Sequence, residues 1–392
     1  MFLVINAGSS SLKVALYGGE HSEPIISVSI EDIGSPEAHL VPESQYGTDQ
    51  TITIDASTHE EAAIQAKQWI ESQIPQLLLI RAVGYRIVHG GDRLKEPTVL
   101  NPEVIGYLES LTPLAPNHMP ATLQCIQVFE RIYDDAVHIG CFDTAFFAGV
   151  PELAHTLPLP RSFREKGMRR YGFHGLSYEY LLNSFREHEG EAAARGRLIF
   201  LHLGSGASIS ALAGGQPVDM SMGFTPVSGI MMSTRTGDIE PGVLIYMQQQ
   251  LGLKPDEVFD IVAKQSGLLG ISGQTGDMYT LLQSQHEDSA AALAIELFCY
   301  TIKKTIGAYT AVLGGVDSIV FTGGIGERSA EIRSRILSGL EFLGIRLDDA
   351  RNKASGRCIS SGDSQTGVHV IPAREDRTIL TQMHDVLRKG GL

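Results

Sequence analysis

The residues near the start of this sequence that are best suited to chemistry form a turn of small polar residues. Asn6–Ser11 (NAGSSS) follows the apolar run Phe2–Ile5 and precedes the alternating segment Leu12–Tyr17, in which Lys13 is the first charged residue. This pattern predicts a buried strand, a tight turn and a second strand. Backbone N–H groups in such a turn can approach an anion closely, and the lysine adds a positive charge. Taken alone the signal for phosphate binding is weak, because Gly-Ser turns join strands in many proteins that bind nothing.

The same unit recurs half a chain away. Leu198–Leu212 again combines an apolar segment, a Gly-Ser turn and a second apolar segment, and Gly204 follows Gly8 by 196 residues in a chain of 392. A third apolar segment, within Ser318–Arg328, runs into a Gly-rich turn and then into charged residues. The recurrence predicts duplicated domains on either side of a nucleotide cleft. The alternative is three unrelated turns in a chain with 42 glycines.

Two charged residues lie near the ends of expected buried strands. Arg86 is embedded in the apolar segment Leu77–Val88, where an arginine is unfavourable unless an anion or a carboxylate pairs with it. Asp143 lies in Val137–Phe147, and open α/β sheets gather ligands at the carboxyl ends of their strands. Each has a structural alternative, which is an ion pair for Arg86 and a helix cap or turn for Asp143.

Two other segments carry cationic side chains among small residues. Arg169–Gly175 (RRYGFHG) combines two guanidinium groups and an imidazole with an aromatic ring between glycines, which suits an oxyanion or a phosphoryl group. The alternative is a pair of surface arginines and a hydrogen-bonded His174 in the core. Met232–Asp238 (MSTRTGD) is a loop of small residues that carries the single arginine Arg235.

Composition restricts the class of protein. A chain of 392 residues exceeds the usual limit for one hydrophobic core, so we expect two domains. The net charge of −14 argues against general affinity for nucleic acid or anionic membranes, and no uncharged apolar run approaches the ~18 residues of a membrane span. The sequence does not begin like a signal peptide. The four cysteines (Cys125, Cys141, Cys299 and Cys358) lack metal-site spacing, so we expect reduced, mostly buried thiols in a cytoplasmic protein.

Helix signals surround these segments. Ser57–Glu60 has the form of a capping box and predicts a helix start, and Pro120 is expected to begin a helix that runs through Glu130. Residues 287–312 form a long helical pattern with mixed apolar faces, expected between domains or at a dimer contact. A last helical pattern ends at Leu387.

Taken together, the sequence resembles the acetate kinase family, which comprises acetate, propionate and other short-chain carboxylate kinases. The matching segments run almost end to end: Val4–Lys13, Arg86–Gly91, Pro113–His118, Phe142–Phe146, Arg170–Gly175, His202–Gly206, Met222–Pro226, Thr234–Asp238, Phe321–Glu327 and Pro372–Asp376. The resemblance implies the duplicated α/β fold of the actin-like ATPases, which sugar kinases, heat-shock ATPases and actin share. It also implies a homodimer, a magnesium–ATP donor and the reversible formation of an acyl phosphate from acetate or a similar short acid.

The domains expected from this fold are an N-terminal domain of residues 1–148, joined by the C-terminal helix at about 377–392, and a domain of residues 149–376 for nucleotide binding and dimerisation. The resemblance also implies roles. Asn6 and Glu375 would hold Mg²⁺, and Asp143, His174 and Arg235 would be catalytic. The acid would contact Arg86, Val88, Asn117, His118, Phe173 and Pro226. The nucleotide would contact Lys13, His202, Leu203, Gly204, Ser205, Gly206, Asp277, Met278, Tyr279, Gly323, Gly324, Ile325, Gly326 and Glu327.

The chemistry of the implied reaction qualifies one of these roles. A short carboxylic acid with a pKa of ~4–5 is already ionised at neutral pH, so it needs no general base. Repulsion between two anions opposes the reaction instead, and Arg86, Arg235, His174 and Mg²⁺ would screen it. We therefore expect Asp143 to organise the metal ion or water rather than to accept a proton.

Six positions depart from the family pattern, and two of them, Phe147 and Ser228, stand where the family usually has His and Glu. Ser205, Tyr279 and Arg328 stand where the family usually has Asn, Arg and Asn, and all three are expected near the base and ribose. Asn117 replaces a usual apolar residue beside the acid, which is unfavourable unless it is paired or meets a polar substrate. One alternative is therefore a kinase that uses another phosphoryl donor, or that acts on propionate or another short acid, which could carry a hydroxyl group. A second alternative is a nucleotide-binding regulatory protein without turnover.

Overall fold

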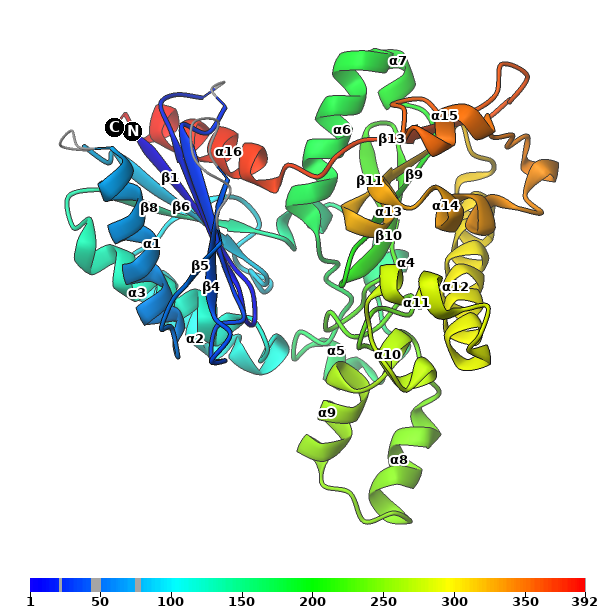
Figure 1. The fold of residues 1–392 in the computed structure, drawn as a ribbon, viewed down its shortest axis with the longest axis horizontal. Coiled ribbons are helices and arrows are strands. Elements are labelled where there is room, and N and C mark those ends of the chain that lie inside the picture. The colour runs from blue at the N-terminus through cyan, green and yellow to red at the C-terminus, as the bar shows by residue number, and fades with distance from the viewer. Residues whose placement is uncertain (21–22, 44–50, 75–78, 392) are drawn as a thin grey trace. The chain divides into compact units, whose positions relative to one another are not determined.

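The computed structural model describes residues 1–20, 23–43, 51–74 and 79–391 of the chain (Figure 1). The chain divides into two units. The first comprises Met1–Phe146 together with Arg374–Leu392, and the second comprises Phe147–Ala373. The C-terminal segment therefore returns to the N-terminal unit, and it does so a few residues earlier than the boundary expected from the sequence.

The first unit is built on an eight-stranded sheet with the order β5-β4-β3-β2-β1-β6-β8-β7. β1, β6 and β8 are parallel, whereas β2, β3, β4 and β5 continue from β1 as an antiparallel meander. The strands are β1 (Phe2–Ala7), β2 (Leu12–Tyr17), β3 (Ile26–Glu31), β4 (His39–Glu43), β5 (Ile52–Thr53), β6 (Ala82–Ile87), β7 (Thr98–Val99) and β8 (Val137–Phe142). Of the segment Leu77–Val88 expected as a strand, residues 77–78 lie outside the described residues, and β6 forms the part that follows.

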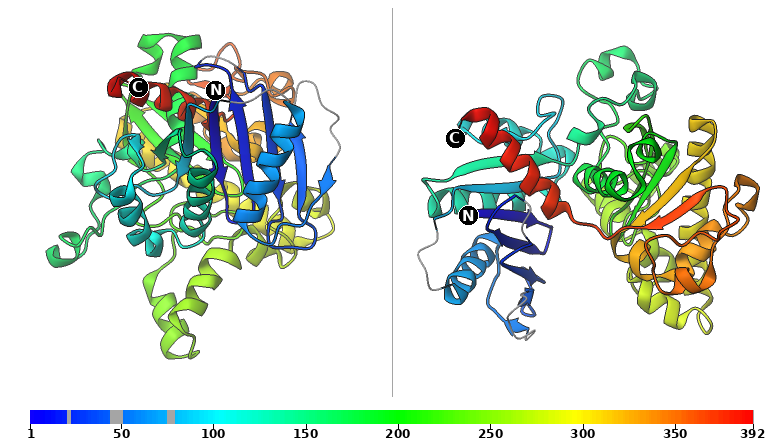
Figure 2. Two further views of the ribbon diagram at one scale, coloured as in Figure 1. Left: turned by 90° about the vertical axis from the view of Figure 1, so that its left-hand side faces the viewer. Right: turned by 90° about the horizontal axis from the view of Figure 1, so that it is seen from above.

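The described part of the first unit has four α-helices: α1 (His59–Gln73), α2 (Pro102–Ser110), α3 (Met119–Ile132) and α16 (Glu375–Gly390). α1, α3 and α16 pack on the sheet, and α2 packs on α3. α3 packs against β1 and β6, and α16 packs against β1, β6 and β8. Figure 2 shows α1 and α16 on opposite sides of the sheet, as a strand with two buried faces requires.

Local sequence signals determine where α1 and α3 begin. Thr58, not Ser57, is the N-cap of α1, because Glu61 completes the capping box by accepting the Thr58 N–H at 3.2 Å. The expected capping box therefore forms one residue later than predicted. α3 starts at Met119, with Pro120 in its first turn as the sequence indicated.

The second unit repeats the strand plan of the first. Its sheet has the order β11-β10-β9-β12-β13, formed by β9 (Leu198–Leu203), β10 (Ala207–Ala213), β11 (Gln216–Met220), β12 (Ser318–Thr322) and β13 (Gly367–Val370). β9 pairs antiparallel with β10 and parallel with β12, as β1 pairs with β2 and β6. The order β11-β10-β9-β12-β13 thus corresponds to β3-β2-β1-β6-β8, and the duplication predicted from the sequence is present.

Twelve α-helices lie in the described part of the second unit: α4 (Glu152–His155), α5 (Arg161–Arg164), α6 (Gly175–Glu189), α7 (Glu191–Ala194), α8 (Pro241–Gln249), α9 (Pro255–Lys264), α10 (Gly267–Ser272), α11 (Met278–Ser284), α12 (Ser289–Leu313), α13 (Gly323–Arg328), α14 (Ala330–Leu337) and α15 (Asp349–Lys353). α6 and α12 lie on opposite sides of the sheet (Figure 1). Within the described ranges, none of the helices has the length and apolar character of a membrane span. All four cysteines are free, and only Cys358 is exposed.

The contact between α16 and β6 fixes the place where the C-terminal segment rejoins the first unit. A Cβ atom built on Gly84 of β6 would lie 2.3 Å from Sδ of Met383 and 2.7 Å from Cγ2 of Ile379, both in α16. Only a residue without a side chain allows so close an approach of helix and strand.

We therefore expect Gly84→Ala to lower the free energy of unfolding by about 1–3 kcal/mol, because the methyl group overpacks this contact. Gly106→Ala in α2 is the matched control, since a Cβ atom there meets nothing within 4 Å. Urea unfolding followed by circular dichroism measures both. Equal transitions for Gly84→Ala and the unmodified protein would contradict the packing of α16 on β6.

Candidate active site

Three neighbouring parallel strands of the first unit bring polar side chains to one edge of the sheet. The register pairs Ile5 of β1 with Tyr85 of β6, so Asn6 and Arg86 lie next to each other on adjacent strands. Asp143 follows the last residue of β8. Because the carboxyl ends of parallel strands meet at one edge, residues from three separate segments converge there.

The guanidinium of Arg86 is the centre of a hydrogen-bonded cluster at this edge. Its Nε and Nη2 atoms donate to Oδ2 of Asp143 at 3.0 and 2.8 Å. Its Nη1 lies 3.2 Å from Oε2 of Glu375, the first residue of α16, and 3.3 Å from Oδ1 of Asn6. Asn6 also donates from Nδ2 to Glu375 at 3.3 Å. The four residues are hereafter called the Arg86 cluster.

Charge pairing stabilises the Arg86 cluster despite its burial. The side chain of Asp143 is 1% exposed, and those of Glu375 and Arg86 are 13% and 19% exposed. Burial lowers the pKa of Arg86, but the carboxylates of Asp143 and Glu375 outweigh this effect and raise that pKa above its usual value. With two carboxylates and one guanidinium the cluster has a formal charge of −1, so one more cation would improve its charge balance.

The donor atoms of the Arg86 cluster suit Mg²⁺. This ion prefers oxygen ligands, and proteins commonly hold it by one or two carboxylates together with phosphate oxygens and water. Glu375, Asp143 and the amide oxygen of Asn6 offer such oxygens. Among the described residues, no group of three or more His, Cys, Asp or Glu side chains could hold a metal ion on its own. The cluster offers three side chains with oxygen donors, so an ion held there would need water or other oxygens to complete its coordination.

The other candidate residues are divided between the units. Lys13 of β2 is exposed and pairs with Asn6 in the β1–β2 register. Val88 is buried directly after β6, and Asn117 and His118 are partly exposed just before α3. In the second unit, Phe173 is buried before α6, and Pro226 lies in the loop after β11.

In the second unit, two donor side chains converge on the turn between β9 and β10. A Cβ atom built on Gly206 would lie 3.4 Å from Nε2 of His174 and 3.6 Å from Nη1 of Arg235. Glycine at this position therefore leaves the space beside both donors open. An imidazole and a guanidinium that face the same small volume are suited to the oxygens of a phosphoryl group.

The imidazole of His174 is held in one orientation. His174 directly precedes α6, and its backbone lies in the left-handed region with a φ of 60°. Residues other than glycine adopt this conformation only at an energetic cost. Its Nδ1 lies 2.9 Å from Oγ of Ser208, which also hydrogen bonds to the hydroxyl of Tyr178 at 2.6 Å. Its ring stacks on that of His202 with centroids 4.2 Å apart. These contacts direct Nε2 toward Gly206.

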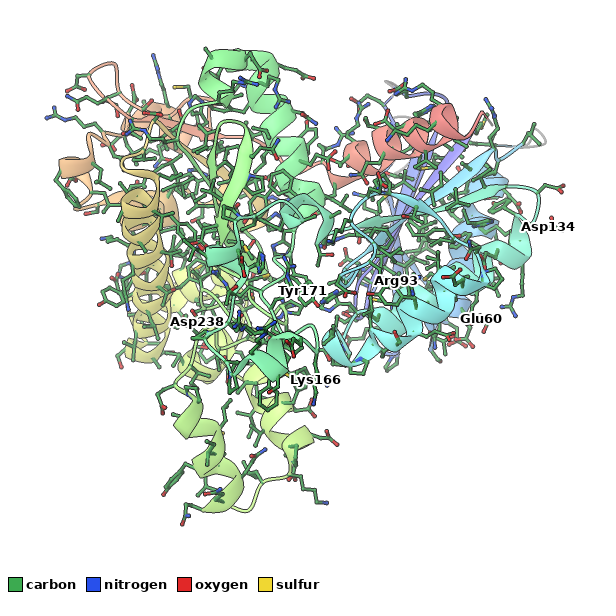
Figure 3. The ribbon with its side chains drawn as sticks, turned by 180° about the vertical axis from the view of Figure 1, so that it is seen from behind. Glu60, Arg93, Asp134, Lys166, Tyr171 and Asp238 are labelled. Carbon is green, nitrogen blue, oxygen red and sulfur yellow. The ribbon has the colours of Figure 1, made fainter. Side chains whose placement is uncertain are left out.

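Several hydrogen bonds fix the loop that carries Arg235. In two of them, the N–H of Gly229 donates to Oδ1 of Asp238 at 2.8 Å, and the N–H of Ser233 donates to the carbonyl of Ser205 at 3.1 Å. Asp238 is labelled in Figure 3. The second bond joins the loop to the β9–β10 turn. Ser233 and Thr234 therefore lie beside the β9–β10 turn, although that turn precedes them by about thirty residues in the chain.

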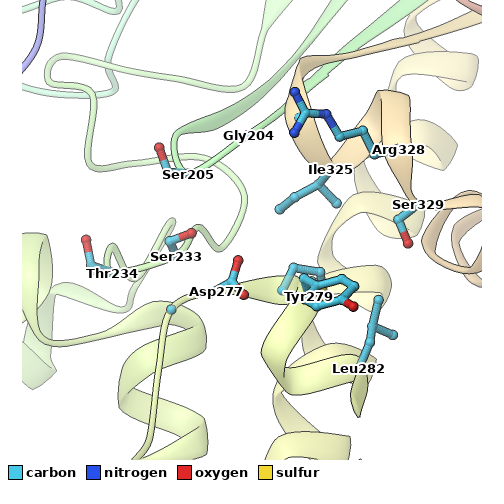
Figure 4. Close-up of a pocket in the computed structure, with 13 residues that line it drawn as sticks. Gly204, Ser205, Ser233, Thr234, Asp277, Tyr279, Leu282, Ile325, Arg328 and Ser329 are labelled. Carbon is cyan, nitrogen blue, oxygen red and sulfur yellow. The ribbon is translucent and has the colours of Figure 1, made fainter. Parts of the chain in front are cut away.

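A pocket of about 670 Å³ opens beside the same turn (Figure 4). Seven of the expected nucleotide-binding residues line it: Gly204, Ser205, Asp277, Met278, Tyr279, Gly324 and Ile325. Six other residues complete the lining, namely Ser233, Thr234, Gly276, Leu282, Arg328 and Ser329. Of these, only Arg328 was associated with a nucleotide site from the sequence. The others adjoin expected residues in the chain or reach the pocket through the Ser233–Ser205 contact.

Of the expected nucleotide-binding residues in the second unit, six lie outside this lining: His202, Leu203, Gly206, Gly323, Gly326 and Glu327. Glu327 illustrates why, because its carboxylate is used within the protein. Its Oε1 accepts hydrogen bonds from the N–H groups of Gly323 at 2.8 Å and Ala373 at 2.9 Å. Glu327 therefore fixes the start of α13 rather than facing the pocket.

Comparison with known proteins gives consistent matches over the full chain. Residues 1–381 match the model of the acetokinase family. An acetate kinase from Rhodopseudomonas palustris (strain TIE-1) is 41% identical over 388 residues, which cover 97% of this chain and 96% of the relative. The crystal structure of Porphyromonas gingivalis acetate kinase superposes with a TM-score of 0.88 at 35% identity, covering 98% of this chain and 99% of that one. A propionate kinase from Francisella tularensis subsp. tularensis superposes with a TM-score of 0.90 at 32% identity, covering 97% and 98%.

The loop that follows Arg86 contains a buried histidine whose titration is open to test. His89 is fully buried, and the N–H of Gly91 donates to its Nδ1 at 2.9 Å. Burial lowers the pKa of His89 from 6.5 to about 4, because a charged ring would lose its hydration. Protonation of Nδ1 would also remove the acceptor of that hydrogen bond.

We expect the contribution of His89 to stability to be complete above about pH 6.5 and to be lost as the pH falls toward 4, since the unfolded chain binds the proton more readily. The loss is on the order of 3 kcal/mol. His89→Asn keeps an acceptor for Gly91 but does not titrate. Its free energy of unfolding, measured by urea titration from pH 7 to 4, should fall less steeply than that of the unmodified protein, and parallel pH profiles would refute the assignment.

Proposed function

The chain belongs to the acetokinase family of phosphotransferases that use a carboxyl group as acceptor, and from this premise we propose that it transfers the terminal phosphoryl group of Mg–ATP to acetate. The family members share the actin-like ATPase fold, and this chain has it. The product would be acetyl phosphate, formed reversibly by direct in-line transfer.

The observation that carries this proposal is the Arg86 cluster, which is built for an anionic substrate. Arg86 is a largely buried guanidinium at the carboxyl end of its strand, and a guanidinium binds a carboxylate through two parallel hydrogen bonds. In this structure its donors are directed to Asp143 and Glu375. We propose that Arg86 binds the acid and screens its charge, so that one anion can attack another.

The geometry at Asp143 supports a role other than proton acceptor. Arg86 donates two hydrogen bonds to the same oxygen of Asp143, and an ionised acid has no proton to give up at neutral pH. We propose that Asp143 fixes Arg86 and, with Asn6 and Glu375, holds the magnesium ion or its water. Mg²⁺ would supply charge neutralisation at the phosphoryl oxygens.

The second unit supplies the proposed nucleotide site and the donors for the phosphoryl group. The pocket beside the β9–β10 turn would hold ATP or ADP, with Lys13 of the first unit contributing to the phosphates. His174 and Arg235, which converge at Gly206, would stabilise the charge that develops on the phosphoryl oxygens. In-line transfer requires the bound acid to reach this phosphoryl group.

Exposed apolar side chains of the second unit support the proposed homodimer. In α8, which has no buried residue, Val243, Ile245 and Tyr246 are exposed, and Leu293 and Tyr300 of α12 are 59% and 58% exposed. Such residues are typical of a surface that a second subunit covers. Free cysteines agree with the proposed cytoplasmic location, and a net charge of −14 agrees with small-molecule partners rather than nucleic acid.

The direct test is to trap the acyl phosphate with hydroxylamine while the acid is varied. With Mg–ATP we expect acetate to give the highest kcat/KM, propionate a lower one and glycolate the lowest. Asn117, a polar and partly exposed residue just before α3, favours a second candidate, a kinase for a hydroxylated short acid. The highest kcat/KM for glycolate would select that candidate. No hydroxamate from any of the three acids would contradict both.

The role of Asp143 has its own test. Asp143→Asn removes one negative charge from the Arg86 cluster, so we expect the Mg²⁺ concentration for half-maximal activity to rise about tenfold, on the order of 1.4 kcal/mol, together with a fall in kcat. Asp363→Asn is the matched control, because Asp363 pairs with Arg346 at the surface. Titration of activity with Mg²⁺ distinguishes the roles. An unchanged Mg²⁺ requirement with a lower kcat would assign Asp143 a role other than metal binding.

A further inference from the structure

Arg328 is the charged side chain of the pocket that has no hydrogen-bond or ion-pair partner among the residues that the structure describes. It ends α13, it is exposed, and no hydrogen bond or ion pair joins its guanidinium to another residue in the described ranges. Arg333, five residues later, is the opposite case. It is fully buried, and its guanidinium donates to the carbonyls of Gly326, Glu327 and Asn352. Arg333 therefore stabilises the fold. The N–H donors of Arg328 make no bond to a described residue and are available to a ligand.

The pocket has a small-residue end and an apolar end, and α13 runs between them. A Cβ atom built on Gly204 would lie 4.0 Å from the backbone nitrogen of Gly324, near the start of α13, so the small-residue end adjoins the turn that His174 and Arg235 face. Arg328 lies four residues further along the helix, about 6 Å away along its axis. The phosphates therefore belong at the first end, and the base belongs at the end that contains Arg328.

The side chains of that second end suit a purine ring. Ile325 and Leu282 line it, and the ring of Tyr279 is 72% exposed and free to stack on a base. In the view of Figure 4, Arg328 and Tyr279 lie on opposite sides of Ile325. A base on Ile325 would thus have an aromatic face on one side and a guanidinium within reach on the other.

The two parallel N–H donors of a guanidinium distinguish 6-oxopurines, such as guanine and hypoxanthine, from adenine. Guanine and hypoxanthine present two neighbouring acceptors, O6 and N7, which match these two donors. Adenine presents N7 beside an amino group, which is itself a donor, so only one hydrogen bond forms and two donors face each other. We propose that Arg328 makes this pocket selective for 6-oxopurine nucleotides over adenine nucleotides, with Tyr279 as the stacking surface. The proposal rests on the proposed function and refines its phosphoryl donor: ATP would still react, but GTP and ITP would be the better donors.

The experiment compares nucleotides on the intact protein in two ways. Calorimetry gives the Kd values of ADP, GDP and IDP with Mg²⁺, and hydroxamate formation from acetate gives kcat/KM for ATP, GTP and ITP. We expect guanine and hypoxanthine nucleotides to have about tenfold lower Kd values and about tenfold higher kcat/KM values than adenine nucleotides, because a difference of this size lies within the range that one bidentate contact to a base provides. Equal values for the three bases, or a preference for adenine, would overturn the proposal.

Variants assign the effect to Arg328. Arg328→Asn should remove most of the tenfold preference while it changes the values for adenine nucleotides less than threefold, because asparagine lacks the two-donor fork of the guanidinium. Arg351→Asn, at an exposed arginine of α15 outside the pocket, should leave the preference unchanged. An equal loss for all bases in Arg328→Asn would place the guanidinium on the ribose or phosphates and refute base recognition. If no nucleotide supports hydroxamate formation, the proposed function fails, and the Kd values of the three diphosphates still decide whether Arg328 reads the base.

Discussion

The first unit depends on a single ionic arrangement, in which the guanidinium of Arg86 is held between the carboxylates of Asp143 and Glu375. A guanidinium this deeply placed is stable only with such partners. The partners in turn require the parallel alignment of β1, β6 and β8 and the return of α16 to the sheet. The core packing of the unit thus determines the geometry of its polar edge. The same anionic partners that stabilise Arg86 give the cluster its affinity for a cation.

The duplicated strand order explains how the two units can have the same architecture and different functional groups. Both units end parallel strands at an edge where loops can vary without disturbing the core. In the first unit that edge carries the charged groups that we propose bind an acid and a metal ion. In the second unit it carries small residues in turns, with His174 and Arg235 supplied by loops and fixed by Ser208 and by the Ser233–Ser205 contact. Small residues allow close approach of a phosphate, whereas fixed donors stabilise its charge.

Much of this could be predicted from the sequence because the signals are local. The apolar runs, the Gly-rich turns and the 196-residue offset indicated the duplication, and the position of Arg86 in a strand required an anionic partner. The identity of that partner could not be predicted by pattern alone. Glu375 meets Asn6 across 369 residues of sequence, and this contact depends on the packing of a helix on a sheet. Glu327 is similar, because nothing local shows that its carboxylate would bind Ala373 rather than line the pocket.

The proposed mechanism requires Arg86 to release the carboxylates of Asp143 and Glu375 and to bind the reacting anions instead. A crystal structure of the protein with Mg–ADP, aluminium fluoride and acetate tests this most directly, since the fluoride complex stands in for the phosphoryl group during transfer. The account predicts that the guanidinium groups of Arg86 and Arg235 both lie within hydrogen-bonding distance of the acetate oxygen or the fluoride atoms. An Arg86 that still binds only Asp143 and Glu375, with acetate and fluoride out of its reach, would contradict it.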